Sequence, residues 1–358
     1  RSGRSKRICS QMNLAQCTDS RDNNFNLIRL LAALCVLITH SFALSIGTAE
    51  AEPLRGRLGM TIGNIAVDVF FVTSGFLVTA SLLRRESGWT FLKARCLRIY
   101  PGLVVMAFLT TYIMGSALTL LPLDVYLLNP ETHFYFLKSA SLVSGVGWVL
   151  PGVFKQNPFR EIVNGSLWTL PYEIGMYASL LLSWLLLRRW LPKGNSAFTK
   201  FALAVLVISV PCLYLSKLIV PNWLNLARLT FMFYTGAVIY IFRARIKLSL
   251  WPVCFAGILA LISILTRNTS LLFIVYSASL AYTIFYFAYV PTGRIRMFNR
   301  VGDYSYGVYI YAFPVQQIIA NLLSPISPWP MVALSGIVTL MLAVISWHVV
   351  EKRFLRLK

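Results

Sequence analysis

Two polar residues stand on one face of the first long apolar segment. Residues 26–45 read NLIRLLAALCVLITHSFALS, and they include Arg29 and His40. The two are eleven positions apart, so on a helix they differ by only about 20° around the axis and about 16 Å in height. A titratable or charged side chain at membrane depth is costly and marks a functional site by default. The spacing therefore predicts a site in which a permanent cation and an imidazole face one path.

Two carboxylates are expected to reach the depth of His40. Asp68 lies in the apolar stretch AVDVFFVTSGFL, and Glu173 ends the stretch NGSLWTLPYE. A lone histidine on an apolar helix is usually a packing residue, but charges at low dielectric need partners, and three titratable groups together favour a site. A carboxylate bonded to one imidazole nitrogen fixes the tautomer and raises the basicity. We expect Asp68 or Glu173 to orient His40 for general-base work.

Ser74 is a nucleophile in principle, but its surroundings, FFVTSGF, favour another interpretation. Small residues such as Ser74 and Gly75 let membrane helices pack closely, and the flanking phenylalanines fill the remaining space. We therefore interpret Ser74 as a packing residue. Its small side chain would leave room at middle depth for the arm of a donor molecule.

The stretch 84–101, RRESGWTFLKARCLRIYP, is rich in arginine and is expected at the cytoplasmic surface. Positive-inside bias explains most such loops. The functional alternative is recognition of phosphates on a cytosolic donor, which guanidinium forks suit well. Arg29 would continue this path inward to His40. The geometry fits a donor with a phosphorylated head at the cytosol and a deep reactive end, as in an acyl-CoA thioester such as acetyl-CoA.

The elements that must position these groups are membrane helices. The chain has 358 residues, of which 57% are hydrophobic and 13% charged, whereas soluble domains carry about 25% charged residues. This composition predicts an all-α polytopic integral membrane protein with about ten transmembrane helices. The expected spans are 26–45, 61–83, 99–120, 170–188, 200–219, 224–242, 249–266, 269–289, 304–323 and 331–350. The weakly apolar segment 137–150 is expected to be re-entrant or interfacial.

The distribution of basic residues predicts the topology. With the N-terminus inside, 24 of the 33 Lys and Arg residues fall in cytoplasmic segments, as the positive-inside rule requires. Both termini are then cytoplasmic, and the long segment 121–169 lies outside. Residues 1–24 are expected to be a basic cytoplasmic tail with little fixed structure, followed by one transmembrane domain at 25–358. The net charge of +21 is better explained by cytoplasmic loops and anionic membrane lipids than by nucleic acid.

The six cysteines do not stand at the spacing of metal ligands, and they indicate neither a zinc site nor a disulfide framework. We also find no Gly-rich phosphate loop and no G-x-S-x-G elbow. No permanently bound metal or cofactor is expected.

Five stretches in this order resemble acyltransferase family 3 over nearly the whole chain. They are Arg29 with His40, VDVFFVTSGFL at 67–77, the arginine-rich stretch ending RIYP at 98–101, NGSLWTLPYE at 164–173, and GDYSYGVYIY at 302–311. Similar proteins move acyl groups, usually acetyl, from cytosolic acyl-CoA to hydroxyls of surface glycans such as lipopolysaccharide O-antigen and exopolysaccharides. Many relatives have a histidine after the SYGVY-like stretch, where this chain has Ala312 and Phe313.

The resemblance implies that Arg29 and His40 are essential, that Arg95 and Arg98 bind the donor, and that Glu173 lies near the site. His40 would deprotonate the acceptor hydroxyl or carry the acyl group for a time, and Arg29 would hold the donor or stabilise the oxyanion. The acceptor would be a glycan or lipid-linked glycan at a bacterial inner membrane. The main rival is a secondary transporter or flippase, which usually shows repeated halves. A non-catalytic scaffold gives no reason for Arg29 and His40 on one face.

Overall fold

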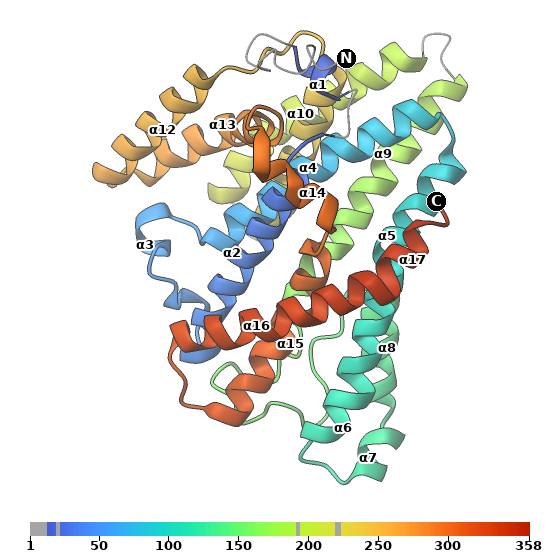
Figure 1. Cartoon of the computed structure of the whole chain (residues 1–358), viewed down its shortest axis with the longest axis vertical. Helices are drawn as coiled ribbons and strands as arrows, with labels where there is room; N and C mark the ends of the chain where they lie inside the picture. Colours follow the sequence, from blue (N-terminus) through green and yellow to red (C-terminus); the bar gives the residue numbers. More distant parts are fainter. Residues whose placement is uncertain (1–12, 19–21, 191–193, 219–222) are drawn as a thin grey trace.

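The structure, a computed structural model, describes residues 13–18, 22–190, 194–218 and 223–358. Over these ranges it is helical, with isolated β-bridges and no strands, which confirms the all-α class. The helices are α1 Leu14–Thr18, α2 Phe25–Ile46, α3 Arg55–Leu58, α4 Ile62–Arg85, α5 Gly88–Phe108, α6 Gly115–Leu118, α7 Leu123–Leu128, α8 Pro130–Ser141, α9 Leu170–Trp190, α10 Gly194–Leu218, α11 Leu224–Ile241, α12 Leu250–Leu265, α13 Thr269–Tyr289, α14 Phe298–Val301, α15 Ser305–Leu323, α16 Pro328–Ser346 and α17 Lys352–Leu355. In Figure 1, α1 lies at one end of the bundle, the α1 end, and α6 and α7 lie at the other, the α6–α7 end.

The helices confirm a polytopic membrane protein, although not the exact number of ten spans. Within the described ranges, eight helical segments are long and apolar enough to cross a membrane. Two of the expected spans correspond to helices that are not among these eight. Helix α12 is too short, with only 16 residues, and α15 is more polar than the eight. Residues 305–317 of α15 are all buried, including Gln316 and Gln317. Because protein rather than lipid surrounds it, α15 does not need an apolar surface.

The helix that carries Arg95 and Arg98 begins eleven residues earlier than the expected span at 99. Ser87 caps α5 by accepting a hydrogen bond from the Thr90 backbone amide at 3.3 Å. A π-helical turn, Leu109–Met114, joins α5 to α6 and gives a continuous segment of 31 residues. That length is about 46 Å, well beyond the hydrocarbon thickness of about 30 Å. The predicted basic loop is therefore wrong over 88–98, where the arginines lie on a helix.

Part of the expected N-terminal tail is ordered. Residues 1–12 and 19–21 lie outside the described residues, but residues 14–18 form α1. Leu14 is fully buried, and its amide donates to the Ile246 carbonyl at 2.8 Å. This short helix is held against the connection between α11 and α12, because it buries an apolar side chain there.

The segment expected outside the membrane folds back on the bundle. Helix α8 packs along α5, and the Tyr100 hydroxyl donates to the Ser141 carbonyl at 3.1 Å. Tyr126 of α7 is fully buried and donates its hydroxyl to the Thr111 carbonyl in the π-helical turn at 2.8 Å. Tyr126 belongs to a second, smaller apolar core at the α6–α7 end. Figure 1 shows helices α6 and α7 below the main bundle.

The main core depends on close contact between α4 and α11. A Cβ added to Gly75 would lie 1.9 Å from the Phe233 carbonyl oxygen, and one added to Gly236 would lie 2.1 Å from the Val72 carbonyl oxygen. Only glycine permits backbones to approach this closely. The interpretation of the S-G pair as a packing feature is thus accurate for Gly75.

Helix α15 forms hydrogen bonds both to α2 and to the segment that precedes α9. The fully buried Gln316 side chain donates to the Leu37 carbonyl at 2.8 Å, and Gln317 donates to the Ile162 carbonyl at 2.6 Å. Buried amides of this kind need such partners. They fix α15 beside α2, where its other end meets Arg29.

Candidate active site

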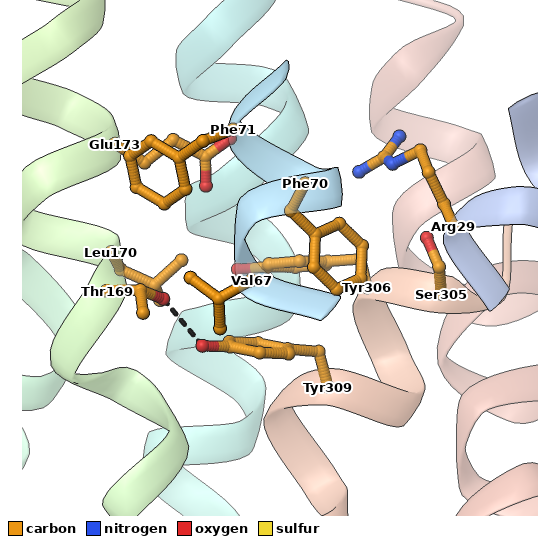
Figure 2. A pocket seen from close by; sticks show the side chains of 10 residues that line it. All are labelled: Arg29, Val67, Phe70, Phe71, Thr169, Leu170, Glu173, Ser305, Tyr306 and Tyr309. Atoms are coloured by element: carbon orange, nitrogen blue, oxygen red, sulfur yellow. Dashed lines mark hydrogen bonds between the residues drawn. The ribbon is translucent and has the colours of Figure 1, made fainter. Parts of the chain in front are cut away.

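A cavity between α2, α4, α9 and α15 contains the two charged residues Arg29 and Glu173 (Figure 2). The empty space between these residues is about 400 Å³ when the open space at its mouth is included. The other lining residues drawn are Val67, Phe70, Phe71, Thr169, Leu170, Ser305, Tyr306 and Tyr309. Figure 2 shows Arg29 and Glu173 approaching from opposite sides. A cleft with a few polar groups in an apolar wall is the usual form of a small-molecule site.

Arg29 enters the cavity from α2 and is held at its outer rim by a carboxylate. Its Nη1 lies 2.8 Å from Oδ2 of Asp303, and its guanidinium lies 5.8 Å from the centre of the Phe70 ring. The buried Nε atom of Arg29 has no hydrogen-bond partner in the structure. A buried donor atom without a partner is costly, so the partly buried Arg29 is suited to receive an acceptor group from a ligand.

Glu173 is fixed by two hydroxyl groups. Ser74 donates to Glu173 Oε1 at 3.1 Å, and the Tyr177 hydroxyl donates to the same oxygen. The guanidinium of Arg95 lies over the Tyr177 ring, 5.8 Å from its centre. Ser74 therefore holds a carboxylate at the cavity, and this contact gives its hydroxyl a role other than nucleophile.

His40 does not line the cavity directly but is connected to its wall through hydrogen bonds of Ser166. Its Nδ1 is 3.4 Å from the Ser166 hydroxyl, and the edge of the Phe313 ring packs on it at 5.1 Å between centroids. The Ser166 carbonyl accepts a hydrogen bond from the Tyr309 hydroxyl at 2.7 Å, and that hydroxyl is 2.6 Å from Thr169 Oγ1. Tyr309 and Thr169 line the cavity. His40 is not among the ten lining residues drawn in Figure 2.

Asp68 has partners on a different side of α4. Its Oδ1 lies 3.6 Å from Nε of Arg228 on α11, and its Oδ2 accepts from the Tyr276 hydroxyl at 2.5 Å. Asp68 is fully buried and Arg228 nearly so. The pair neutralises two charges between α4, α11 and α13. The sequence led us to expect Asp68 beside His40. The structure does not bring these two residues together, so this expectation is wrong for Asp68.

Arg95 and Arg98 differ in their partners. Arg98 has two carboxylates, with Nη2 2.6 Å from Asp303 Oδ2 and Nη1 3.7 Å from Glu351 Oε2. Arg95 forms no ion pair within the described part of the chain, and its buried Nε has no hydrogen-bond partner. Partial burial lowers the pKa of Lys358 to about 7, and the neighbouring guanidinium groups, first those of Arg95 and Arg98, add to this effect. Crowded cations favour an anionic ligand.

Three residues of this region were not singled out from the sequence. Asp303 and Tyr309 lie in the quoted stretch GDYSYGVYIY, and Ser166 lies in NGSLWTLPYE. A signal existed for Asp303, since it is one of only 12 acidic residues and stands next to an expected span. Ser166 and Tyr309 gave no such signal, because hydroxyl side chains are common in membrane helices.

Comparisons with known proteins agree with the resemblance noted above. The profile of an acyltransferase domain matches residues 22–348. An O-acetyl transferase of Shigella phage Sf6 is 30% identical over 94% of this chain and 96% of its own length. Nodulation protein 10 of Rhizobium leguminosarum bv. viciae is 32% identical over 48% of this chain and 47% of its own length. No solved structure matches the chain significantly. The chain is therefore a membrane protein that belongs to acyltransferase family 3.

Proposed function

We propose that this protein transfers an acyl group, acetyl by preference, from cytosolic acyl-CoA to a hydroxyl of a surface or exported polysaccharide, free or lipid-linked. The similarity to a phage O-acetyl transferase over nearly the full length supports the reaction class. The observation that carries the proposal is the short connection between His40 and the cavity. Ser166 contacts His40 on one side and Tyr309 of the cavity wall on the other.

The donor would enter from the α1 end, which we assign to the cytosol. The phosphates would contact Arg95, whose guanidinium forms no ion pair within 4 Å among the described residues. The pantetheine arm would pass Ser74 and Glu173 and bring the thioester past Arg29. A guanidinium with a free buried N–H can stabilise the oxyanion that develops on the thioester carbonyl.

His40 would act as the general base. Contact with Ser166 at Nδ1 fixes the ring and leaves Nε2 for the acceptor hydroxyl. Nε2 removes the hydroxyl proton while the hydroxyl oxygen attacks the thioester carbonyl. The new C–O ester bond forms, the C–S bond breaks, and the coenzyme A thiolate takes the proton from the imidazolium. Glu173 accepts hydrogen bonds from Ser74 and Tyr177, and among the described residues it makes no hydrogen bond with His40.

The test uses the purified protein in detergent with acetyl-CoA labelled in the acetyl group and a polysaccharide acceptor. We expect label in the polysaccharide as an alkali-labile ester, with release of free thiol in equal amount. Binding of acetyl-CoA without transfer or thioester hydrolysis would instead support a transporter or flippase. Label that is retained on the protein, passes to the polysaccharide when the acceptor is added and is absent from His40→Ala would show that His40 carries the acyl group and would exclude direct transfer.

A further inference from the structure

Asp303 lies at the centre of a group of charged side chains that contact one another at the rim of the cavity and join three helices. Its Oδ2 receives Arg29 Nη1 at 2.8 Å and Arg98 Nη2 at 2.6 Å. Its Oδ1 receives the Ser305 hydroxyl at 2.5 Å and the Ser305 amide at 3.3 Å. The Asp303 side chain is only 11% exposed. All the accepting capacity of this carboxylate is directed to named groups of the protein.

Arg98, the second arginine of this group, is fixed from three directions. Besides Asp303, Arg98 has Glu351 at 3.7 Å, and its guanidinium lies 5.6 Å from the centre of the Tyr306 ring. The Glu351 Oε1 atom is in turn held by the Ser346 hydroxyl at 3.0 Å. Carboxyl groups thus contact Arg98 from two sides. These contacts occupy the guanidinium group that a donor phosphate would otherwise meet.

We propose that Asp303 is a positioning residue that aims Arg29 into the cavity, and that Arg98 acts through Asp303 rather than by binding the donor. The inference rests on the proposed function, since Arg29 must act on the donor. Without the carboxylate, two guanidinium groups would converge at low dielectric with one counter-charge fewer, and they would repel each other. Arg29 would then leave the position from which it meets the thioester.

The carboxylate is ionised under ordinary assay conditions. Burial raises the pKa of Asp303, but Arg29 and Arg98, with hydrogen bonds from Ser305, hold it at about 2. A lowered pKa means that the ion pairs stabilise the protein above the ordinary carboxyl pKa and are lost only as the pH falls toward 2. The Asp303 carboxylate therefore stays ionised at every pH from 5 to 9, and its own titration does not change the effect of Asp303→Asn in this range.

The experiment compares Asp303→Asn, Arg98→Ala and the double variant in the detergent assay. We expect Asp303→Asn to lower kcat by about 10- to 100-fold, the range for loss of a partner that orients a working group, with no increase in KM for acetyl-CoA. Arg98→Ala should lower kcat less and also leave KM unchanged. In the double variant Arg98→Ala should add almost nothing, because its partner is already absent. Asp303→Glu should recover part of kcat.

A matched control and a separate readout exclude a purely structural role. Glu86→Gln removes a carboxylate from an exposed ion pair with Arg188 at 3.2 Å, and we expect unchanged kcat. Binding of desulfo-CoA, measured by calorimetry, reports folded protein without turnover, and we expect wild-type affinity in Asp303→Asn. The inference is overturned if Asp303→Asn keeps its kcat, or if Arg98→Ala raises KM in both backgrounds. Absence of transfer by the wild type would instead refute the proposed function.

Discussion

At the scale of residues, His40 is the side chain that the proposed chemistry needs most. His40→Ala removes the base, and we expect kcat to fall by about 10²- to 10⁴-fold, which is the usual contribution of general-base catalysis. The affinity for desulfo-CoA should stay near the wild-type value, because the phosphates bind far from the imidazole. Single-turnover transfer of labelled acetyl groups together with calorimetry measures both quantities.

His133→Ala provides the control for this change. This histidine is exposed and contacts Tyr112 and the Leu127 carbonyl at the α6–α7 end. We expect unchanged transfer in this variant. Near-normal transfer by a well-folded His40→Ala protein would exclude His40 as the base.

Arg95 should behave differently from Arg98. Loss of a charge-assisted hydrogen bond costs about 1.5–3 kcal/mol, so Arg95→Ala should raise KM for acetyl-CoA by about 10- to 100-fold with little change in kcat. Dephospho-CoA thioesters, which lack one phosphate, would test the contact directly, since they should discriminate less between Arg95→Ala and the wild type. An unchanged KM in Arg95→Ala would assign the donor phosphates to other cations.

At the scale of elements, the contact between α4 and α11 sets the position of Ser74 and, through it, of Glu173. Gly75→Ala would place a methyl group 1.9 Å from the Phe233 carbonyl oxygen, which the helices can accept only by moving apart. Overpacking of this kind typically costs about 1–3 kcal/mol. We expect a lower midpoint of thermal unfolding in detergent and reduced transfer.

Gly257→Ala is the matched control, because an added Cβ at this position of α12 meets nothing within 4 Å. Alanine has a higher helix propensity than glycine, so this variant should be at least as stable as the wild type. A Gly75→Ala protein of wild-type stability would contradict the close packing of α4 on α11.

Hydrophobic periodicity predicts most of the elements but not their polar extensions. Within the described residues, eight of the ten expected spans agree with helices that are long and apolar. The early start of α5 was missed because its first three turns contain Lys93, Arg95 and Arg98. These residues lower the local hydropathy, which we interpreted as a loop. The ordered α1 was missed for a related reason, since five residues with one buried leucine give no periodic signal.

The site was predictable only where spacing along one helix fixes geometry. Arg29 and His40 share α2, and the cavity does contain Arg29 and Glu173. Which carboxylate meets which cation depends on how the helices rotate against one another. Asp68 pairs with Arg228 rather than with His40, and Asp303 is the partner of Arg29. Contacts between distant segments of this kind cannot be read from local pattern.

At the scale of the whole molecule, the mechanism requires that donor and acceptor arrive from opposite sides of the membrane. The bundle has the α1 end, with the arginine-rich start of α5, and the α6–α7 end (Figure 1). From the positive-inside rule we expect the first at the cytosol. Donor phosphates would then bind near Arg95, and the glycan would reach His40 from the side of the α6–α7 end.

Labelling of single cysteines tests this assignment. The two positions are Glu86, exposed at the end of α4, and Asp124, exposed on α7. Each is changed to cysteine in a protein whose native cysteines are replaced, since Cys212 and Cys254 are exposed and would react. In intact cells a membrane-impermeant maleimide should label Asp124→Cys and not Glu86→Cys, and after lysis it should label both. Labelling of Glu86→Cys alone in intact cells would place the arginines outside, where no acyl-CoA is present, and the mechanism would have no donor.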